Sequence, residues 1–299
     1  YLTSIICIDG DYSEQNIFNF KKLLEKASNF YETKKTKSSD PAIIIYTSGT
    51  TGGPKGALLP HRVLLGHIPG VEMPHEFLSS SEPVQDIFWT PADWAWIGGL
   101  FDVLLPAWHF GLSVISYRGK KFDPEFAFYL LSKFNIKNTF LPPTALKMMK
   151  SYNSSKRLDN LNLRTVGSGG EALGEDLLEW GKDILGVGIN EFYGQTECNL
   201  TISNNGAIMP TKQGSIGKPV PGHLVRLMDK NNQFIIKPGY DGEIVVKYDT
   251  PVAFLKYWEN DIETKQKVID GWLHTGDYAY KDDDGYFYFK GREDDIINS

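Results

Sequence analysis

The stretch that most constrains this chain is residues 46–56, which read YTSGTTGGPKG. An apolar, β-branched run at 42–45 precedes it and is predicted to form a buried strand. Glycines let backbone N–H groups approach a ligand, hydroxyls donate hydrogen bonds to phosphate oxygens, and a lysine adds positive charge. The stretch therefore predicts a loop that wraps a polyphosphate. A plain flexible turn is the simpler interpretation, but a turn requires neither this set of hydroxyls nor the lysine.

The loop differs from a Walker A loop, which ends in Gly-Lys-Ser/Thr, because Pro54 precedes Lys55 and Gly56 follows it. It resembles instead the phosphate loop of the adenylate-forming superfamily, which includes acyl-CoA synthetases, luciferases and the adenylation domains of peptide synthetases. The resemblance implies that the phosphates of ATP are bound by residues of this loop, namely Thr47, Ser48, Gly49, Thr50, Thr51, Gly52 and Lys55.

Four later segments resemble motifs of the same superfamily and occur in the order expected for it. They are a GGE-type turn at 170–172, the YGQTE run at 193–197, the HTGD run at 274–277 and the hinge-like GREDDIINS at 291–299. The turn implies adenine contacts, the HTGD aspartate implies binding of both ribose hydroxyls, and the hinge implies a pivot at Asp294. The implied nucleotide contacts are Gly170, Glu171, Ala172, Tyr193, Gly194, Gln195, Thr196, Asp277 and Arg292.

The resemblance is strongest to short- and medium-chain acyl-CoA synthetases, which implies a carboxylic acid, ATP and CoA as substrates. Attack of a carboxylate on the α-phosphorus of ATP brings an anion to a polyanion, so positioning and charge neutralisation carry the reaction. The implied catalytic residues are Lys55, Thr196 and Glu197, and Glu197 is also the implied ligand of Mg²⁺.

The aromatic stretch 91–111 is predicted to be a helix whose tryptophans either pack in the core or line an apolar ligand pocket. By the resemblance, the acyl pocket is lined by Trp96, Ile97, Gly98, Gly169 and Gly194. The two last glycines are expected to leave an apolar space at the channel end. Each methylene buried there contributes about 0.8 kcal/mol, so an acid of intermediate length is expected to be preferred to acetate.

Strands and helices alternate up to residue 197, which predicts an α/β fold with a mostly parallel sheet flanked by helices. Short strands separated by glycine and proline dominate after Pro210 and predict a small β-barrel-like subdomain. The predicted parts are an α/β nucleotide- and acyl-binding part at 1–210, the β subdomain at 211–291 and the hinge at 292–299. The chain is interpreted as an incomplete N-terminal domain, with its first portion and a C-terminal domain missing. Within 1–40, the spacing of apolar residues predicts a helix over 13–31, followed by a polar linker at 32–40.

Other functions remain open at this point. The run GSGGEA at 167–172 follows a predicted strand, and Glu191 lies where a ribose-binding acid is expected, so an NAD-dependent oxidoreductase is one alternative. That alternative leaves the loop at 47–56 unexplained. An adenylating domain that loads a carrier protein is a second alternative, and a non-catalytic nucleotide-binding remnant is a third.

Composition excludes further classes. The net charge of -6, with no offsetting cluster of Lys and Arg, argues against nucleic-acid binding. Two cysteines provide no disulfide framework, so a cytoplasmic location is expected. The longest apolar stretch, 94–110, contains Asp102 and His109 and is too short and polar for an integral membrane segment. His61, His67 and His75 fit no common metal motif. The oligomeric state is not predicted.

Overall fold

The structure, a computed structural model, describes residues 3–10, 14–47, 53–78, 86–117, 119, 121–153, 160–171 and 173–292. The chain divides into two compact units, 1–37 and 38–299, and the boundary falls within the stretch predicted to be a linker. In the first unit, strand β1 (Ile5–Cys7) pairs in parallel with β2 (Ile17–Asn19), and helix α1 (Phe20–Lys26) follows directly.

The helix predicted over 13–31 is wrong in extent. Residues 17–19 form a strand, and the side chain of Asn19 accepts a hydrogen bond from the backbone N–H of Lys22 at 3.0 Å, which starts α1 there. Phe20 and Leu24, two residues of the predicted apolar stripe, are 41% and 58% exposed. The apolar spacing therefore did not mark a buried helix face in this unit.

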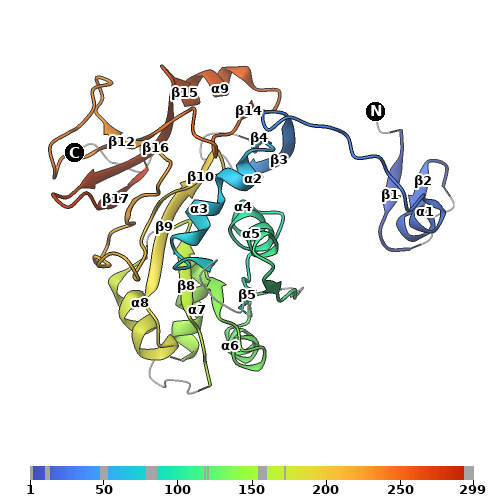
Figure 1. Cartoon of the computed structure of the whole chain (residues 1–299), viewed down its shortest axis with the longest axis horizontal. Helices are drawn as coiled ribbons and strands as arrows, with labels where there is room; N and C mark the ends of the chain where they lie inside the picture. The colour runs from blue at the N-terminus through green and yellow to red at the C-terminus, as the bar shows by residue number, and fades with distance from the viewer. Residues whose placement is uncertain are drawn as a thin grey trace. The chain divides into compact units, whose positions relative to one another are not determined.

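The second unit is built on a mostly parallel sheet (Figure 1). Five neighbouring strands run parallel, and an antiparallel pair completes one edge, in the order β11-β10-β9-β8-β7-β5-β6. The central strands are buried along their length, as expected where helices cover both faces of a parallel sheet. The strands are β5 (Ile87–Trp89), β6 (Ser113–Val114), β7 (Asn138–Phe140), β8 (Thr165–Gly169), β9 (Ile189–Gln195), β10 (Cys198–Ser203) and β11 (Lys218–Pro219).

Helices pack against this sheet. One core cluster joins Leu130, Leu146 and Leu177 of three helices to strand residues such as Val166. Helix α6 begins as predicted, because the Asp123 carboxylate accepts from the N–H of Glu125 at 3.0 Å. The helices of the unit are α2 (Val63–Gly66), α3 (Ile68–Glu72), α4 (Ile97–Gly99), the π-helix η2 (Leu100–Leu104), α5 (Leu105–His109), α6 (Pro124–Lys133), α7 (Pro143–Tyr152), α8 (Glu175–Trp180), the π-helix η3 (Gly181–Leu185) and α9 (Asp261–Lys267).

Two smaller sheets complete the unit. An antiparallel sheet contains β12 (Val225–Met228), β13 (Gly242–Lys247), β15 (Val268–Ile269), β16 (Trp272–Lys281) and β17 (Phe287–Arg292). A three-stranded sheet contains β3 (Pro41–Thr47), β4 (Lys55–Pro60) and β14 (Lys256–Tyr257). One core cluster joins the three sheets through residues such as Ile45, Tyr193 and Val246. The predicted fold class, a mostly parallel α/β sheet followed by a β subdomain, is confirmed.

Within the described ranges, none of the helices combines the length and apolar character that a membrane span requires. The two cysteines are free thiols, with Cys198 buried in the core. His67 and His75 are buried side chains, and the described part of the chain holds no group of three metal-binding side chains.

Candidate functional site

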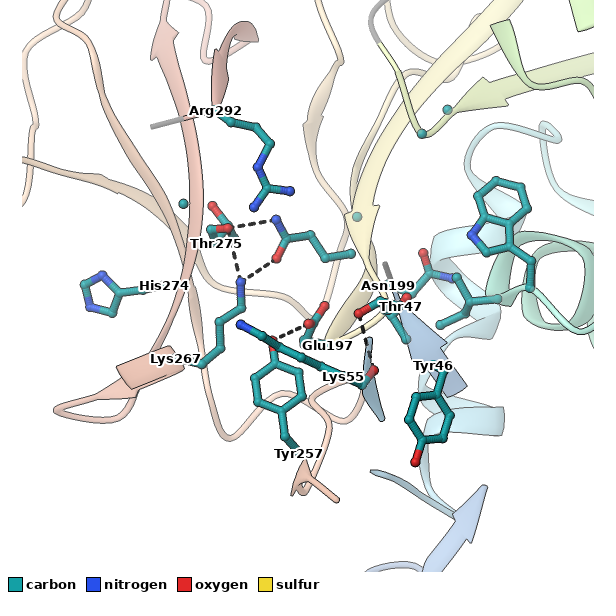
Figure 2. A pocket seen from close by; sticks show the side chains of 18 of the residues that line it. Tyr46, Thr47, Lys55, Glu197, Asn199, Tyr257, Lys267, His274, Thr275 and Arg292 are labelled. Atoms are coloured by element: carbon teal, nitrogen blue, oxygen red, sulfur yellow. Dashed lines mark hydrogen bonds between the residues drawn. The ribbon is translucent and has the colours of Figure 1, made fainter. Parts of the chain in front are cut away.

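A cavity of about 650 Å³ lies where the three sheets of the second unit meet (Figure 2). Residues from motifs far apart in the sequence line it together. The predicted site residues that line this cavity are Thr47, Lys55, Trp96, Ile97, Gly169, Gly170, Gly194, Gln195, Thr196, Glu197 and Arg292. The segments that the sequence assigned to phosphate, nucleotide and acyl binding therefore open onto one space.

Other predicted site residues do not line this cavity or fall outside the described ranges. Glu171 lines a second cavity of about 340 Å³, which shares Trp96, Gly169 and Gly170 with the first. Gly98, Tyr193 and Asp277 are described but do not line the main cavity, and their roles stay predictions. The predicted residues outside the described ranges are Ser48, Gly49, Thr50, Thr51, Gly52, Ala172 and Asp294.

Lys55 begins strand β4 and points into the cavity (Figure 2). Its ammonium lies 2.7 Å from the carboxylate of Glu263 on α9. The neighbouring Glu197 side chain accepts a hydrogen bond from the hydroxyl of Tyr257. Burial and this carboxylate raise the pKa of Tyr257, so its hydroxyl remains a donor. The cavity thus holds a lysine and two carboxylates in its polar wall.

A second lysine lines the same cavity. The ammonium of Lys267, at the end of α9, lies 2.8 Å from Gln195 Oε1 and 3.1 Å from the carbonyl oxygen of Thr275. Both partners are neutral acceptors. Figure 2 shows the Lys267 side chain extending toward Lys55 and Thr275. This cavity therefore has two lysines and Arg292 in its lining, a combination that suits a polyanionic ligand.

Asp277 lies beneath the cavity rather than in its lining. Its Oδ2 accepts hydrogen bonds from the hydroxyl of Tyr193 and from Nε2 of Gln195, both at 2.6 Å, while Arg292 Nε lies 3.9 Å from Oδ1. The ladder between β13 and β16 is irregular at 275–277, and Gly276 there has φ +74°. A residue other than glycine is strained in that conformation, which explains the glycine before Asp277.

Tyr193 is 9% exposed, and its ring packs against Phe289 at 6.4 Å between centroids. Burial and Asp277 raise the pKa of its hydroxyl well above the usual value. The structure thus places Tyr193 as the support of Asp277 and of the core, whereas its predicted contact with the nucleotide stays a prediction.

The two glycines of the expected acyl channel are packed closely by their neighbours. A Cβ at Gly194 would lie 2.3 Å from the backbone nitrogen of Leu200, and one at Gly169 would lie 2.5 Å from the ring of Phe192. Both glycines line the cavity, but neighbouring atoms already fill the volume that their side chains would take. These glycines permit close packing of β8, β9 and β10, so their smallness does not measure the length of the acyl channel.

The dinucleotide alternative also finds no support. The Glu191 carboxylate is 4% exposed, accepts a hydrogen bond from the N–H of Leu173 at 3.1 Å, and lines neither cavity described above. Burial raises its pKa to about 7. Glu191 is therefore an interior residue rather than one that faces a ribose.

Several lining residues were not predicted, among them Asp102, Asn199, Glu243, Tyr257, Glu263, Gln266, Lys267 and His274. Helix α9 supplies three of these. Its signal was present in the sequence, because Asn260 caps the helix by accepting from the N–H of Glu263, three residues on. For Asp102 and Asn199, the sequence offers no signal beyond a polar residue within an apolar stretch.

Comparison with known proteins identifies the family. The family model described as "AMP-binding enzyme" matches residues 2–258. The chain belongs to the AMP-binding enzyme family. A curated relative, the mitochondrial acyl-coenzyme A synthetase ACSM5 of Homo sapiens, is 34% identical over 293 residues, which are 97% of this chain and 49% of the relative.

Solved structures agree with this assignment. ATP-bound MatB from Rhodopseudomonas palustris has a TM-score of 0.82 and 27% identity, over 93% of this chain and 53% of that protein. The anthranilate CoA ligase AuaEII in complex with anthranoyl-AMP has a TM-score of 0.84 and 27% identity, over 99% of this chain and 56% of that protein. The chain thus spans about half the length of the curated relatives and solved structures that it matches.

The residues of this AMP-binding chain also fit a magnesium ion. Mg²⁺ at nucleotide sites is held by one or two carboxylates together with phosphate oxygens. Glu197 and Glu263 both line the cavity that also contains Lys55. The donor set is therefore suitable for an ion that arrives with ATP, even though the described residues form no self-contained metal site.

Proposed function

We propose that the intact protein is an acyl-CoA synthetase, which joins a carboxylic acid to AMP at the expense of ATP and then transfers the acyl group to CoA. The convergence of Lys55, Gln195–Glu197, Lys267 and Arg292 on one cavity carries the proposal. The names of the family and of its relatives, an acyl-coenzyme A synthetase and a CoA ligase with a bound acyl-AMP, support it.

In the first step, an oxygen of the substrate carboxylate attacks the α-phosphorus of ATP. The bond from that phosphorus to the bridging oxygen of the β-phosphate breaks, and pyrophosphate leaves with the electron pair. Lys55 and Lys267, which both line the cavity, are proposed to neutralise phosphate charge, and Thr196 in the same lining is proposed as a hydroxyl donor. Asp277, held by Tyr193 and Gln195, is proposed to bind the ribose hydroxyls.

Magnesium, when bound by Glu197 together with the phosphates, supplies further charge neutralisation. The chain's own residues prepare the site for this. Tyr257 orients the Glu197 carboxylate with its hydrogen bond, and Glu263 holds the Lys55 ammonium in the cavity before the nucleotide arrives. Binding of the triphosphate then exchanges the contact to Glu263 for contacts to phosphate oxygens.

In the second step, the sulfur of CoA attacks the carbonyl carbon of the acyl-adenylate, and the carbon–oxygen bond to AMP breaks. The names of the relatives favour CoA as the acceptor, and no feature of the cavity favours a carrier protein. The intact protein, incubated with ATP, Mg²⁺, a panel of acids and CoA, is expected to release acyl-CoA detectable by mass spectrometry. Acylation of a carrier protein, without acylation of CoA, would contradict the proposal. A cytoplasmic location stays a prediction.

A further inference from the structure

The acyl end of the cavity combines aromatic walls with two polar side chains. Trp96, Phe140 and Phe192 form a continuous aromatic surface, with ring centroids 5.8 Å apart for Trp96–Phe140 and 5.3 Å apart for Phe140–Phe192. Asp102 and Asn199 line the same cavity. In Figure 2, Asn199 lies across the cavity from Lys267 and His274, on the side opposite the one proposed to bind the phosphates. This arrangement separates a phosphate-binding side from an acyl-binding side that is not purely apolar.

Asp102 is a buried carboxylate whose hydrogen bonds are asymmetric. Its side chain is 4% exposed. Oδ1 accepts from His67 Nε2 at 2.8 Å and from Asn199 Nδ2 at 2.6 Å. Within the described ranges, both hydrogen bonds of Asp102 end on Oδ1. Oδ2 is not one of the fully buried atoms that lack a hydrogen-bond partner, so it is not sealed inside the protein. Oδ2 is therefore an acceptor left available toward the cavity that Asp102 lines.

Local backbone irregularities place both polar residues. Asp102 lies within the π-helix η2, a form that is rare and often found at functional sites. Asn199 lies next to Leu200, which has φ +52°, at an irregular point in the pairing of β9 with β10. Bulges of this kind redirect a side chain. Two separate departures from regular structure thus bring a carboxylate and an amide to the same wall.

A purely structural role explains these residues less well. A buried carboxylate costs free energy unless all its acceptor sites are satisfied, and an apolar residue there would pack against the aromatic surface without that cost. Asn199 also lines the cavity, and because its Nδ2 contacts Asp102 and His67, its Oδ1 is the second acceptor. Two acceptors beside an apolar surface suit a ligand with an apolar body and a hydrogen-bond donor.

We propose that Asp102 and Asn199 select a carboxylic acid whose acyl group carries a hydroxyl or amino group, which donates to Asp102 Oδ2. His67 is a positioning residue that holds Oδ1 from behind. The inference rests on the proposed acid activation and specifies its substrate class. It replaces the expectation, drawn from the glycines alone, that the acyl channel ends in an apolar space.

The test uses matched acids with the intact protein. Acid-dependent release of pyrophosphate gives kcat/KM for butyrate, 4-hydroxybutyrate and 4-aminobutyrate, and for benzoate, 4-hydroxybenzoate and 4-aminobenzoate. Leaving a buried acceptor such as Asp102 Oδ2 without a hydrogen bond costs about 1–3 kcal/mol, which predicts a preference of about 10- to 100-fold for the donor-bearing acid in at least one series. The hydroxyl and amino acids of that series show which donor is used.

The variant Asp102→Asn keeps the volume and the acceptor at Oδ1 but presents an NH₂ group in place of Oδ2. It is expected to lower the preference at least about tenfold, because kcat/KM for the donor-bearing acid falls more than kcat/KM for the apolar acid. Asp86→Asn is the matched control, since Asp86 is also a buried carboxylate, bonded to Asn138 and Arg164, but lies outside the cavity. Its preference is expected to equal that of the wild type.

The outcomes separate the two proposals. Equal use of both members of every wild-type pair, or better use of the apolar acid throughout, overturns this inference while leaving acid activation intact. A preference that survives Asp102→Asn also overturns it. If Asp102→Asn fails to fold, the test uses the wild-type comparison and the variant Asn199→Leu. This variant is expected to weaken the same preference for the donor-bearing acid. No pyrophosphate release with any acid would contradict the proposed function as well.

Discussion

The ammonium of Lys55 lies 2.7 Å from the carboxylate of Glu263, so the lysine expected to bind phosphate already has an anionic partner within the cavity. A triphosphate must compete with that carboxylate for the lysine. The side chain of Glu263 is 34% exposed, and solvent therefore screens the pair.

This pairing predicts that Glu263→Gln strengthens ATP binding by a few-fold, because it removes a competing charge without removing volume. Calorimetry with the intact protein and ATP in the absence of Mg²⁺ measures the effect. The equivalent change Asp176→Asn, in the Lys150–Asp176 pair outside the cavity, is the control and should leave ATP affinity unchanged. Weaker ATP binding by Glu263→Gln without Mg²⁺ would show that this carboxylate does not compete with the nucleotide.

Lys267 is predicted to contact the phosphates of ATP. Among the described residues its ammonium has only neutral oxygen partners, at 2.8 and 3.1 Å, which leaves its charge available to an anion. Lys267→Gln should reduce kcat/KM for ATP by an amount equivalent to about 1.5–3 kcal/mol, as for a lost charge-assisted hydrogen bond. The neighbouring Lys265→Gln, on the exposed side of the same helix, should leave it unchanged. Equal effects of both variants would indicate a general charge effect instead of a specific contact.

Asp277 is predicted to bind the ribose of the nucleotide through the oxygen that Tyr193 and Gln195 do not use. Asp277→Asn retains the side-chain volume and should weaken binding of both ATP and AMP, because an ionised acceptor of the ribose hydroxyls is lost. Calorimetry with AMP isolates this effect from the phosphates. Tyr193→Phe removes one support of Asp277 and should cause a smaller loss. AMP affinity unchanged in Asp277→Asn would rule out the ribose role.

The elevated pKa of Glu191 predicts a dependence of stability on pH. Its pKa is raised from 4.5 to about 7 by burial, so the folded protein holds a proton that the unfolded chain releases between these values. This contribution to stability is present below about pH 4.5 and is lost as the pH rises through 7. Each pKa unit corresponds to about 1.4 kcal/mol, so the loss from pKa 4.5 to about 7 amounts to at most about 3.5 kcal/mol.

Glu191→Gln abolishes this titration. Denaturant unfolding at pH 5 and pH 8 should show that the variant gains stability relative to the wild type on going to pH 8. His75 and His223 also titrate abnormally, because burial lowers their pKa values to about 3 and about 4. Both proteins contain them, so their contributions cancel when the free energy of unfolding of the variant is subtracted from that of the wild type. If the difference in free energy of unfolding between wild type and variant is the same at pH 5 and pH 8, Glu191 is not protonated in the folded protein.

The motifs and the fold class were predictable because each motif combines residue types that a specific chemistry requires. The loop at 46–56, the YGQTE run and the HTGD run each brought residues to the cavity, where the end of β9 in the parallel sheet meets the antiparallel sheets that contain β3–β4 and β16. The start of α6 was likewise readable, since Asp123 and Pro124 favour a helix start whatever the tertiary context.

The parts that could not be predicted depend on tertiary packing. The apolar spacing over 13–31 satisfied a helical period, yet Phe20 and Leu24 are exposed and part of that stretch is a strand. Gly194 suggested an open channel because its side chain is small, but the bulge at Leu200 fills the space beside it. Asp102 lay within an apolar stretch, and only the π-helix and the contact with His67 revealed where its carboxylate lies.

The exchange of labelled pyrophosphate into ATP by the intact protein tests acid activation most directly, because this exchange reports formation of the acyl-adenylate and needs no CoA. We predict exchange that depends on an added carboxylic acid, proceeds without CoA, and falls by about 10- to 100-fold in Lys55→Ala through loss of a charge-assisted contact. No exchange with any acid, or exchange at the wild-type rate in Lys55→Ala, would contradict it.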